Sequence, residues 1–322
     1  MQAGYATLVW ALEPIKALLE HPDTTEITFE EPHVCGVERM GTWYFHDVPE
    51  MDRDRLHAIA ILAAHVTGKS ITASSESAAS VLPGGERIKM LVPPAVPEGT
   101  VGLCIRRRAL SFTPTLEWLA DGGYFEELNP AIDWVSWWRE VARGDDPRRR
   151  VVVFSGGIAE SKTTASEAVL RAIPEFLRLV TVEGSPEWLF KRRNWQRLFF
   201  NEAEPASATR RIQDAMQLAA KSLWLQESRG AEAWALLRAL KTGVSGGTTI
   251  HAPSAIGAFG SIESMIRQSG YDEPDLHRTL RQYIHVVAHC RRYLPRNDGE
   301  RSRYRMTEVL EVGATAEEDR CP

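Results

Sequence analysis

The stretch VVVFSGGIAESKTT at residues 151–164 determines the fold class of this sequence. It opens with an apolar run typical of a buried strand, turns through Gly156 and Gly157, and enters a helix-like stretch at Lys162 and Thr163. At such a junction the backbone N–H groups and the positive end of the helix dipole face an anion, and a lysine neutralises phosphate charge. The stretch therefore predicts a phosphate-binding loop; the alternative is an ordinary strand-turn-helix connection with the same residues.

Individual residues of this loop have expected roles. We expect Lys162 to contact the phosphates of a nucleoside triphosphate, and the hydroxyl of Thr163 to complete the ligand shell of Mg²⁺. The usual pattern Gly-x-x-x-x-Gly-Lys-Thr starts at Gly156, but Ser161 stands at its second glycine. If that position needs a positive φ, serine adopts it less readily than glycine does. Glu160 also adds negative charge beside a site built for anions, so weakened binding is expected.

Composition limits the class of protein. The chain has 322 residues, enough for two domains, with 43% hydrophobic and 25% charged residues, as in a soluble globular protein. A formal charge of -5 lacks the excess of positive charge that is typical of nucleic-acid-binding proteins, so no direct nucleic-acid partner is expected. The four cysteines are scattered without Cys-x-x-Cys spacing, which indicates reduced thiols in a cytoplasmic protein rather than a zinc site. Neither a signal peptide nor a bilayer-spanning apolar run is visible.

The pattern along the chain changes once. Residues 1–110 mix helical and strand-like segments and predict a small α+β domain. Residues 111–130 contain prolines and glycines around one short helix and are interpreted as a linker. Residues 131–322 alternate helices and strands, which predicts a mainly parallel sheet with crossover helices. The predicted fold is therefore α/β, with a phosphate-loop domain preceded by a smaller α+β domain.

Two glutamates follow apolar runs in the second domain. Glu183 ends the run LVTVE, and Glu227 comes shortly after LWL. The carboxyl ends of strands face the ligand crevice in doubly wound sheets, so we expect both carboxylates to converge on Lys162. One would orient magnesium through water and the other would activate the attacking water, although each alone could be a solvated strand end. His251 ends the stretch TTIH and is either a sensor of the terminal phosphate or a structural histidine.

These motifs, in this order, resemble those of the hexameric secretion ATPases that power type IV secretion, conjugative transfer and pilus assembly. In that family the loop reads Ser-Gly-Gly-Thr-x-Ser-Gly-Lys-Thr-Thr, and an acidic box, a second acidic segment and a histidine box follow it. The corresponding segments here are SGGIAESKTT at 155–164, VEGSPE at 182–187, QESRGAEA at 226–233 and TTIHA at 248–252. The likeness continues in the first domain through LPGGER at 82–87, PPAVP at 93–97 and IR at 105–106.

The resemblance implies a RecA-like motor domain behind a sensor-like N-terminal domain, assembled as a homo-hexamer that binds ATP and Mg²⁺. By position, Glu183 would assist the attack of water, Glu227 would be a second catalytic acid reaching magnesium through water, and His251 would be the sensor. Thr163 would be the metal ligand. The residues implied to bind nucleotide are Gly156, Gly157, Ser161, Lys162, Thr163, Thr164, Arg87 and Arg106. The implied partner is inner-membrane secretion or conjugation machinery, with membrane contact only through it.

The sequence departs from the family at positions that face nucleotide. Ser161 and Gln226 stand where glycine is usual, Gly184 replaces an aspartate, and Val244 replaces a histidine. The charged residues that would touch phosphate persist. We therefore expect an ATP-hydrolysing ring motor of low activity; the alternative is a slow or inactive nucleotide-binding scaffold subunit of the same ring. A nucleic-acid motor of the same core fold is disfavoured by the acidic balance.

Overall fold

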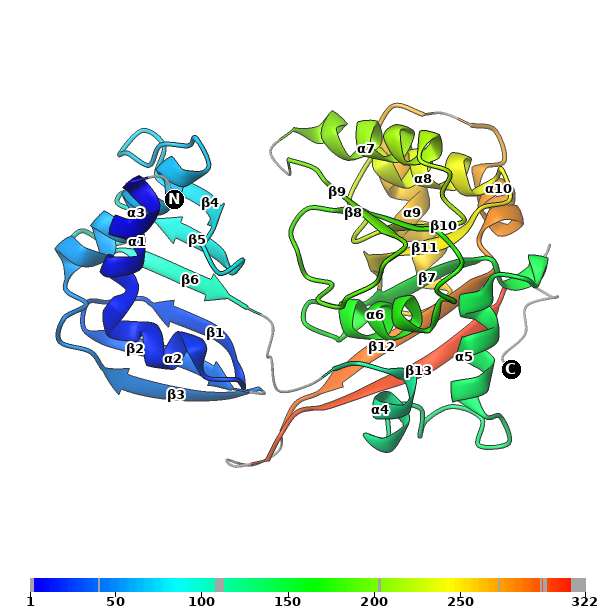
Figure 1. Ribbon diagram of the computed structural model, residues 1–322, viewed down its shortest axis with the longest axis horizontal. Coiled ribbons are helices and arrows are strands. Elements are labelled where there is room, and N and C mark those ends of the chain that lie inside the picture. Colours follow the sequence, from blue (N-terminus) through cyan, green and yellow to red (C-terminus); the bar gives the residue numbers. More distant parts are fainter. Residues whose placement is uncertain are drawn as a thin grey trace. The chain divides into compact units, whose positions relative to one another are not determined.

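A computed structural model describes residues 3–39, 41–107, 113–201, 204–271, 273–295, 297 and 300–313 (Figure 1). The chain forms two compact units. Unit 1 comprises Met1–Phe112 with Pro295–Ser302, and unit 2 comprises Thr113–Leu294 with Arg303–Pro322. Each unit has a sheet and a hydrophobic core of its own.

Unit 1 is an antiparallel sheet with helices packed on it. The six strands lie in the order β3-β2-β1-β6-β5-β4. Their bounds are β1 Thr24–Phe29, β2 Val34–Arg39, β3 Thr42–Asp47, β4 Ser77–Val81, β5 Arg87–Leu91 and β6 Gly102–Arg106. The helices are α1 Ala3–Leu12, the 3₁₀ turn η1 Glu13–Ile15, α2 Lys16–Glu20 and α3 Arg53–Val66. Unit 1 is therefore an α+β arrangement.

Helix α3 shows why these residues fold as they do. Asp52 caps its N-terminus, accepting a hydrogen bond from the Arg55 N–H at 2.8 Å. Leu56, Ile59 and Ala63 recur at helical spacing on one face and are fully buried. They join the unit 1 core with side chains from α1 and the sheet.

Unit 2 is a mainly parallel sheet, as predicted. The seven strands lie in the order β13-β12-β7-β11-β10-β8-β9, and only β13 runs antiparallel to its neighbour. Their bounds are β7 Val151–Gly156, β8 Leu179–Glu183, β9 Trp195–Phe199, β10 Ser222–Leu225, β11 Ser245–His251, β12 Val286–Tyr293 and β13 Arg303–Glu311. The helices are α4 Leu116–Asp121, α5 Trp134–Arg143, α6 Lys162–Ala172, α7 Pro205–Gln217, α8 Glu232–Leu240, α9 Gly257–Gln268 and α10 Leu276–Tyr283, with a 3₁₀ turn η2 Pro147–Arg149.

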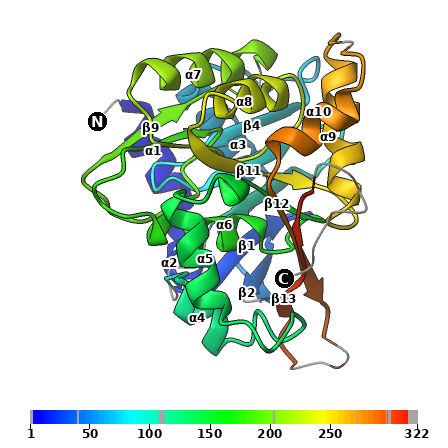
Figure 2. The ribbon, with the colours of Figure 1, turned by 90° about the vertical axis from the view of Figure 1, so that its right-hand side faces the viewer.

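Helices cover both faces of this sheet (Figures 1 and 2). The central strand β7 is buried throughout and alternates its side chains between two cores. Val152 and Phe154 pack against α4, α5 and α6, where Trp138, Phe154 and Trp224 stack with ring centroids 5.4 and 6.3 Å apart. Val151 and Val153 pack against α7 to α10. Across the described ranges, no helix has both the length and the apolar character that a bilayer crossing requires.

The segment interpreted as a linker is largely part of unit 2. Leu116, Leu119, Tyr124 and Phe125 are buried in the core that also contains α5 and α6. Prolines and glycines made 111–130 look like a connection, but its leucines and aromatic side chains bury enough apolar surface to fold against the sheet. Its first two residues lie outside the described part of the chain.

Candidate nucleotide-binding site

The phosphate loop joins β7 to α6 and takes an unusual backbone path. Gly156 has φ 155°, and a Cβ atom there would lie 2.5 Å from the carbonyl oxygen of Cys290, so only glycine fits. Ser161 has φ 62° and ψ 16°, and Ala159 has φ 57°. The expectation that position 161 needs a positive φ is therefore confirmed, and a serine adopts the conformation that glycine usually supplies.

Lys162 begins α6 and turns its ammonium group back over the loop. Its Nζ donates to the carbonyl oxygen of Gly157 at 2.5 Å and lies 3.3 Å from Nδ1 of His251. The residue is buried, and burial lowers the pKa of its ammonium group while the Glu227 carboxylate opposes that shift. A phosphate oxygen would offer this lysine a stronger, charged partner than either present one.

His251 connects Lys162 to Glu227. Its Nε2 lies 3.1 Å from Oε1 of Glu227, whose other oxygen accepts a hydrogen bond from Arg229 at 2.9 Å. A hydrogen bond from the Lys162 ammonium group requires Nδ1 of His251 to be the acceptor. Burial alone would raise the pKa of Glu227, but Arg229, His251 and Lys162 together hold that pKa below its usual value. The structure thus brings three predicted site residues together.

Glu183 has different partners. It is fully buried at the end of β8, where Nε of Arg197 donates to Oε1 at 2.9 Å and Nη2 donates to Oε2. The Thr181 hydroxyl also donates to Oε1, at 2.6 Å. Burial raises the pKa of Glu183, and the bonds from Arg197 and Thr181 oppose the rise. Both carboxylate oxygens are therefore engaged within β8 and β9 rather than by Lys162.

Comparisons with known proteins agree with this geometry. The type IV secretion protein VirB11 of Brucella suis biovar 1 is 28% identical over 308 residues, covering 88% of this chain and 84% of that protein. The type IV secretion protein PtlH of Bordetella pertussis is 29% identical over 324 residues, covering 94% and 95%. The chain is thus similar, over most of its length, to ATPases of type IV secretion systems. No model of a known protein family matches this chain.

A solved structure supports the fold of this chain. The ATPase DotB of Legionella pneumophila matches with a TM-score of 0.63 over 96% of this chain and 81% of that one, at 14% identity. This similarity supports the fold alone, a RecA-like α/β arrangement.

The two N-terminal arginines predicted to bind nucleotide are neighbours within unit 1. Arg87 on β5 pairs directly with Arg106 on β6 in the antiparallel register. Arg106 also pairs with Glu26 on β1, whose carboxylate lies 3.4 Å from its guanidinium group. Like charges directly opposite each other across two strands are unfavourable unless an anion is shared.

The remaining predicted residues lie at the start of α6. Thr163 and Thr164 occupy its first turn and are half-buried, and the Thr163 carbonyl oxygen accepts a hydrogen bond from Ser166 at 3.0 Å. In the part of the chain that the structure describes, no group of three or more His, Cys, Asp or Glu side chains forms a ready metal site.

Sequence reasoning missed several side chains around the loop. Tyr124 lies 2.9 Å from the Ser161 hydroxyl. Glu160, expected only to add negative charge, also accepts a hydrogen bond from the Gly157 N–H. Glu187 contributes to the charge felt by Lys162. Its place at the end of the acidic box is a signal that could have identified it, whereas nothing in the sequence connects Tyr124 with a loop 37 residues away.

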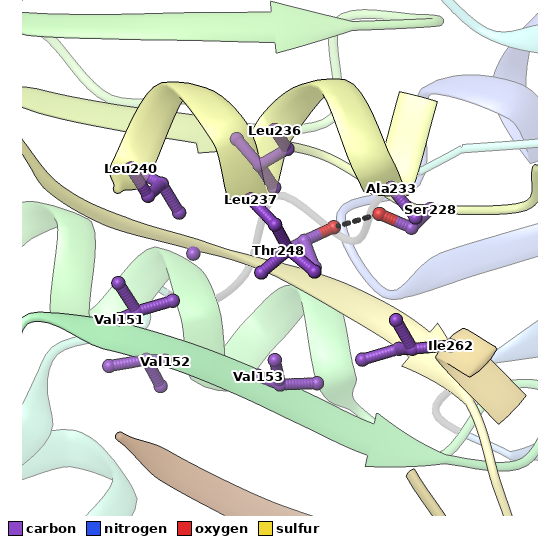
Figure 3. Close-up of a pocket in the computed structure, with 11 residues that line it drawn as sticks. Val151, Val152, Val153, Ser228, Ala233, Leu236, Leu237, Leu240, Thr248 and Ile262 are labelled. Carbon is purple, nitrogen blue, oxygen red and sulfur yellow. Dashed lines mark hydrogen bonds between the residues drawn. The ribbon is translucent and has the colours of Figure 1, made fainter. Parts of the chain in front are cut away.

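An apolar cavity elsewhere in unit 2 is not this site. It lies between β7, β11 and α8, and its walls include Val151, Leu236, Leu240 and Ile262 (Figure 3). Its few polar groups include the hydroxyls of Ser228 and Thr248, which bond each other at 3.0 Å. No residue of the phosphate loop lines this cavity. Aliphatic walls with satisfied hydroxyls offer nothing to a phosphate, so the cavity belongs to the packing of the core.

Proposed function

We propose that this chain is an ATP-hydrolysing subunit of a homo-hexameric ring motor that energises a type IV secretion or conjugal transfer apparatus. The observation that carries the proposal is the contact chain from Lys162 through His251 to Glu227, beside a loop with a left-handed residue at position 161. The relatives named as type IV secretion proteins support the setting. We place the ring in the cytoplasm, where it contacts the inner membrane only through the secretion machinery.

The loop residues fit a magnesium nucleotide. The ammonium group of Lys162 would leave the Gly157 carbonyl oxygen for the outer phosphates of ATP, and the amides at the start of α6 would face the same charge. Gly156, Gly157, Ser161 and Thr164 would complete the cradle, and Thr163 would hold Mg²⁺, with Glu227 acting through water. When bound, Mg²⁺ neutralises charge on the phosphate oxygens.

Glu227 is our candidate for orienting the attacking water, with His251 as the sensor. Its carboxylate stays ionised because its pKa is depressed, and it lies one imidazole away from Lys162. Movement of Lys162 toward phosphate would free Nδ1 of His251 and change its contact with Glu227. Glu183 could assist water only after Arg197 releases it, so we expect Glu227→Gln to reduce hydrolysis more than Glu183→Gln does.

Two arginines of unit 1 are further candidates for binding phosphate. Arg87 and Arg106 face each other across β5 and β6, and two guanidinium groups side by side suit a shared phosphate. We propose that they reach the nucleotide and report its presence to the N-terminal domain. Replacing both with glutamine should weaken ATP binding while leaving the unit 1 core intact.

One alternative function has an observation in its favour. The strained Ser161 and the engaged Glu183 would both slow turnover, as in a nucleotide-binding scaffold subunit of the same ring. Magnesium-dependent phosphate release by the purified protein, with Lys162→Ala as control, separates the two. A motor releases phosphate faster than the variant, and equal rates would favour the scaffold. Light scattering with and without ATP tests the hexamer.

A further inference from the structure

The hydroxyl of Tyr124 contacts the phosphate loop at Ser161, where the usual pattern has the glycine before the lysine. Tyr124 Oη lies 2.9 Å from Oγ of Ser161, the serine in the left-handed conformation. An L-residue with a side chain is strained there and relaxes toward negative φ unless something holds it. We propose that Tyr124 is a positioning residue that takes over the task of the missing glycine, holding Ser161 left-handed and the loop in its phosphate-binding shape.

Tyr124 is well fixed for this task. Its side chain is buried, and its ring packs edge-on against Phe125 with centroids 5.6 Å apart. Its backbone N–H donates to the Leu119 carbonyl oxygen at 2.9 Å, and its own carbonyl oxygen accepts from the Met306 N–H of β13 at 2.8 Å. The hydroxyl therefore extends from a point fixed to both α4 and the sheet.

The direction of the hydrogen bonds follows from counting protons. The Ser161 hydroxyl donates to the Glu160 carbonyl oxygen at 2.6 Å, and it has a single proton to give. The bond to Tyr124 must then be donated by the tyrosine. Burial raises the pKa of Tyr124 well above its usual value, so this proton is retained at any physiological pH.

The consequence for binding lies in the peptide between Glu160 and Ser161. In a trans peptide the C=O and N–H groups point in opposite directions. Fixing the Glu160 carbonyl oxygen through the Ser161 hydroxyl therefore also fixes the direction of the Ser161 N–H. That N–H stands immediately before the helix whose first amides would face an anion. Tyr124 touches no phosphate itself, and this inference rests on the proposed nucleotide-binding function of the loop.

A double-mutant cycle tests the inference, with ADP as the probe and its affinity measured by titration calorimetry. Tyr124→Phe removes one hydrogen bond and should weaken ADP binding about fivefold. Ser161→Gly restores a residue that needs no support and should bind ADP at least as tightly as the wild type. In the Ser161→Gly background, Tyr124→Phe should change the affinity by less than about twofold. Tyr293→Phe, which removes a hydroxyl bonded to Glu127 at 2.8 Å, is the matched control and should change nothing.

The same cycle in urea, without nucleotide, separates this inference from the proposed function. Tyr124→Phe should lower the unfolding midpoint in the wild-type background and not in the Ser161→Gly background. If the wild type binds no ADP and this non-additivity persists, the proposed function fails and the Tyr124 assignment holds. If Tyr124→Phe has equal effects in both backgrounds, by either measurement, the tyrosine merely fills the core and the inference is overturned.

Discussion

Replacing Arg197 with methionine should destabilise unit 2 strongly, because it leaves the buried carboxylate of Glu183 without its positively charged partner. The guanidinium group donates to both oxygens of Glu183, whose side chain is 0% exposed, while that of Arg197 is 26% exposed. Methionine keeps a long aliphatic side chain. It removes the charge, its donors and the contacts of the guanidinium group with the rings of Trp195 and Phe199, whose centroids lie 4.8 and 5.1 Å away. Breaking a buried ion pair by removing one partner costs about 3–5 kcal/mol, and the partial exposure of Arg197 favours about 3 kcal/mol.

The loss should depend on pH, and its sign can be worked out. The pKa of Glu183 is already raised by burial, so the folded state holds this proton more tightly than the unfolded state. Such a group contributes stability that is present below its unfolded pKa and is lost as pH rises through its higher folded pKa. Without Arg197 the folded pKa rises further. The deficit of Arg197→Met should therefore be largest at neutral pH and shrink as the pH falls.

Urea unfolding followed by tryptophan fluorescence at neutral and mildly acidic pH measures both effects. Arg210→Met is the control, since its ion pair with Glu204 at 2.7 Å is more than half exposed on both sides and should contribute less than about 1 kcal/mol. Adding Glu183→Gln to Arg197→Met should recover most of the lost stability. A pH-independent deficit no larger than that of Arg210→Met would refute the buried-pair reasoning.

Two further predictions concern the loop itself. His251→Ala removes the side chain that links Lys162 to Glu227 and should lower the steady-state rate of phosphate release by about 100-fold or more. The melting temperature should change little, because the imidazole is half-exposed. An unchanged rate would remove the histidine from the mechanism. Gly156→Ala places a Cβ atom 2.5 Å from the Cys290 carbonyl oxygen and should both destabilise unit 2 and abolish ATP binding. Thermal unfolding and ATP titration measure the two effects. A variant that is stable and binds ATP would contradict the loop geometry.

The sequence was most informative where local pattern and chemistry coincide. The apolar run before the loop, the lysine at position 162 and the parallel strands of unit 2 follow from short-range patterns, and the structure contains them. The expected approach of Glu227 to Lys162 is also seen, with His251 between the two side chains, whereas a contact of His251 with Glu227 was not predicted.

What sequence reasoning missed depends on contacts between distant segments. Strand β9 has a half-exposed pattern with no clear alternation, so it was not predicted, and with it Arg197 was missed as the partner of Glu183. The hairpin of β12 and β13 was missed as well, and the polar, arginine-rich end of β12 gives one reason. Tyr124 was assigned to a linker because the prolines and glycines around it outweighed its aromatic neighbours.

Equilibrium binding of ATP in the presence of magnesium, by the wild type and by Lys162→Ala, tests the central claim most directly. If the loop from Gly156 to Lys162 is the triphosphate site, the wild type saturates below millimolar ATP and the variant, which lacks a charge-assisted donor, binds at least roughly tenfold more weakly. Equal affinity of the two proteins, or no saturation by the wild type at millimolar ATP, would contradict the account.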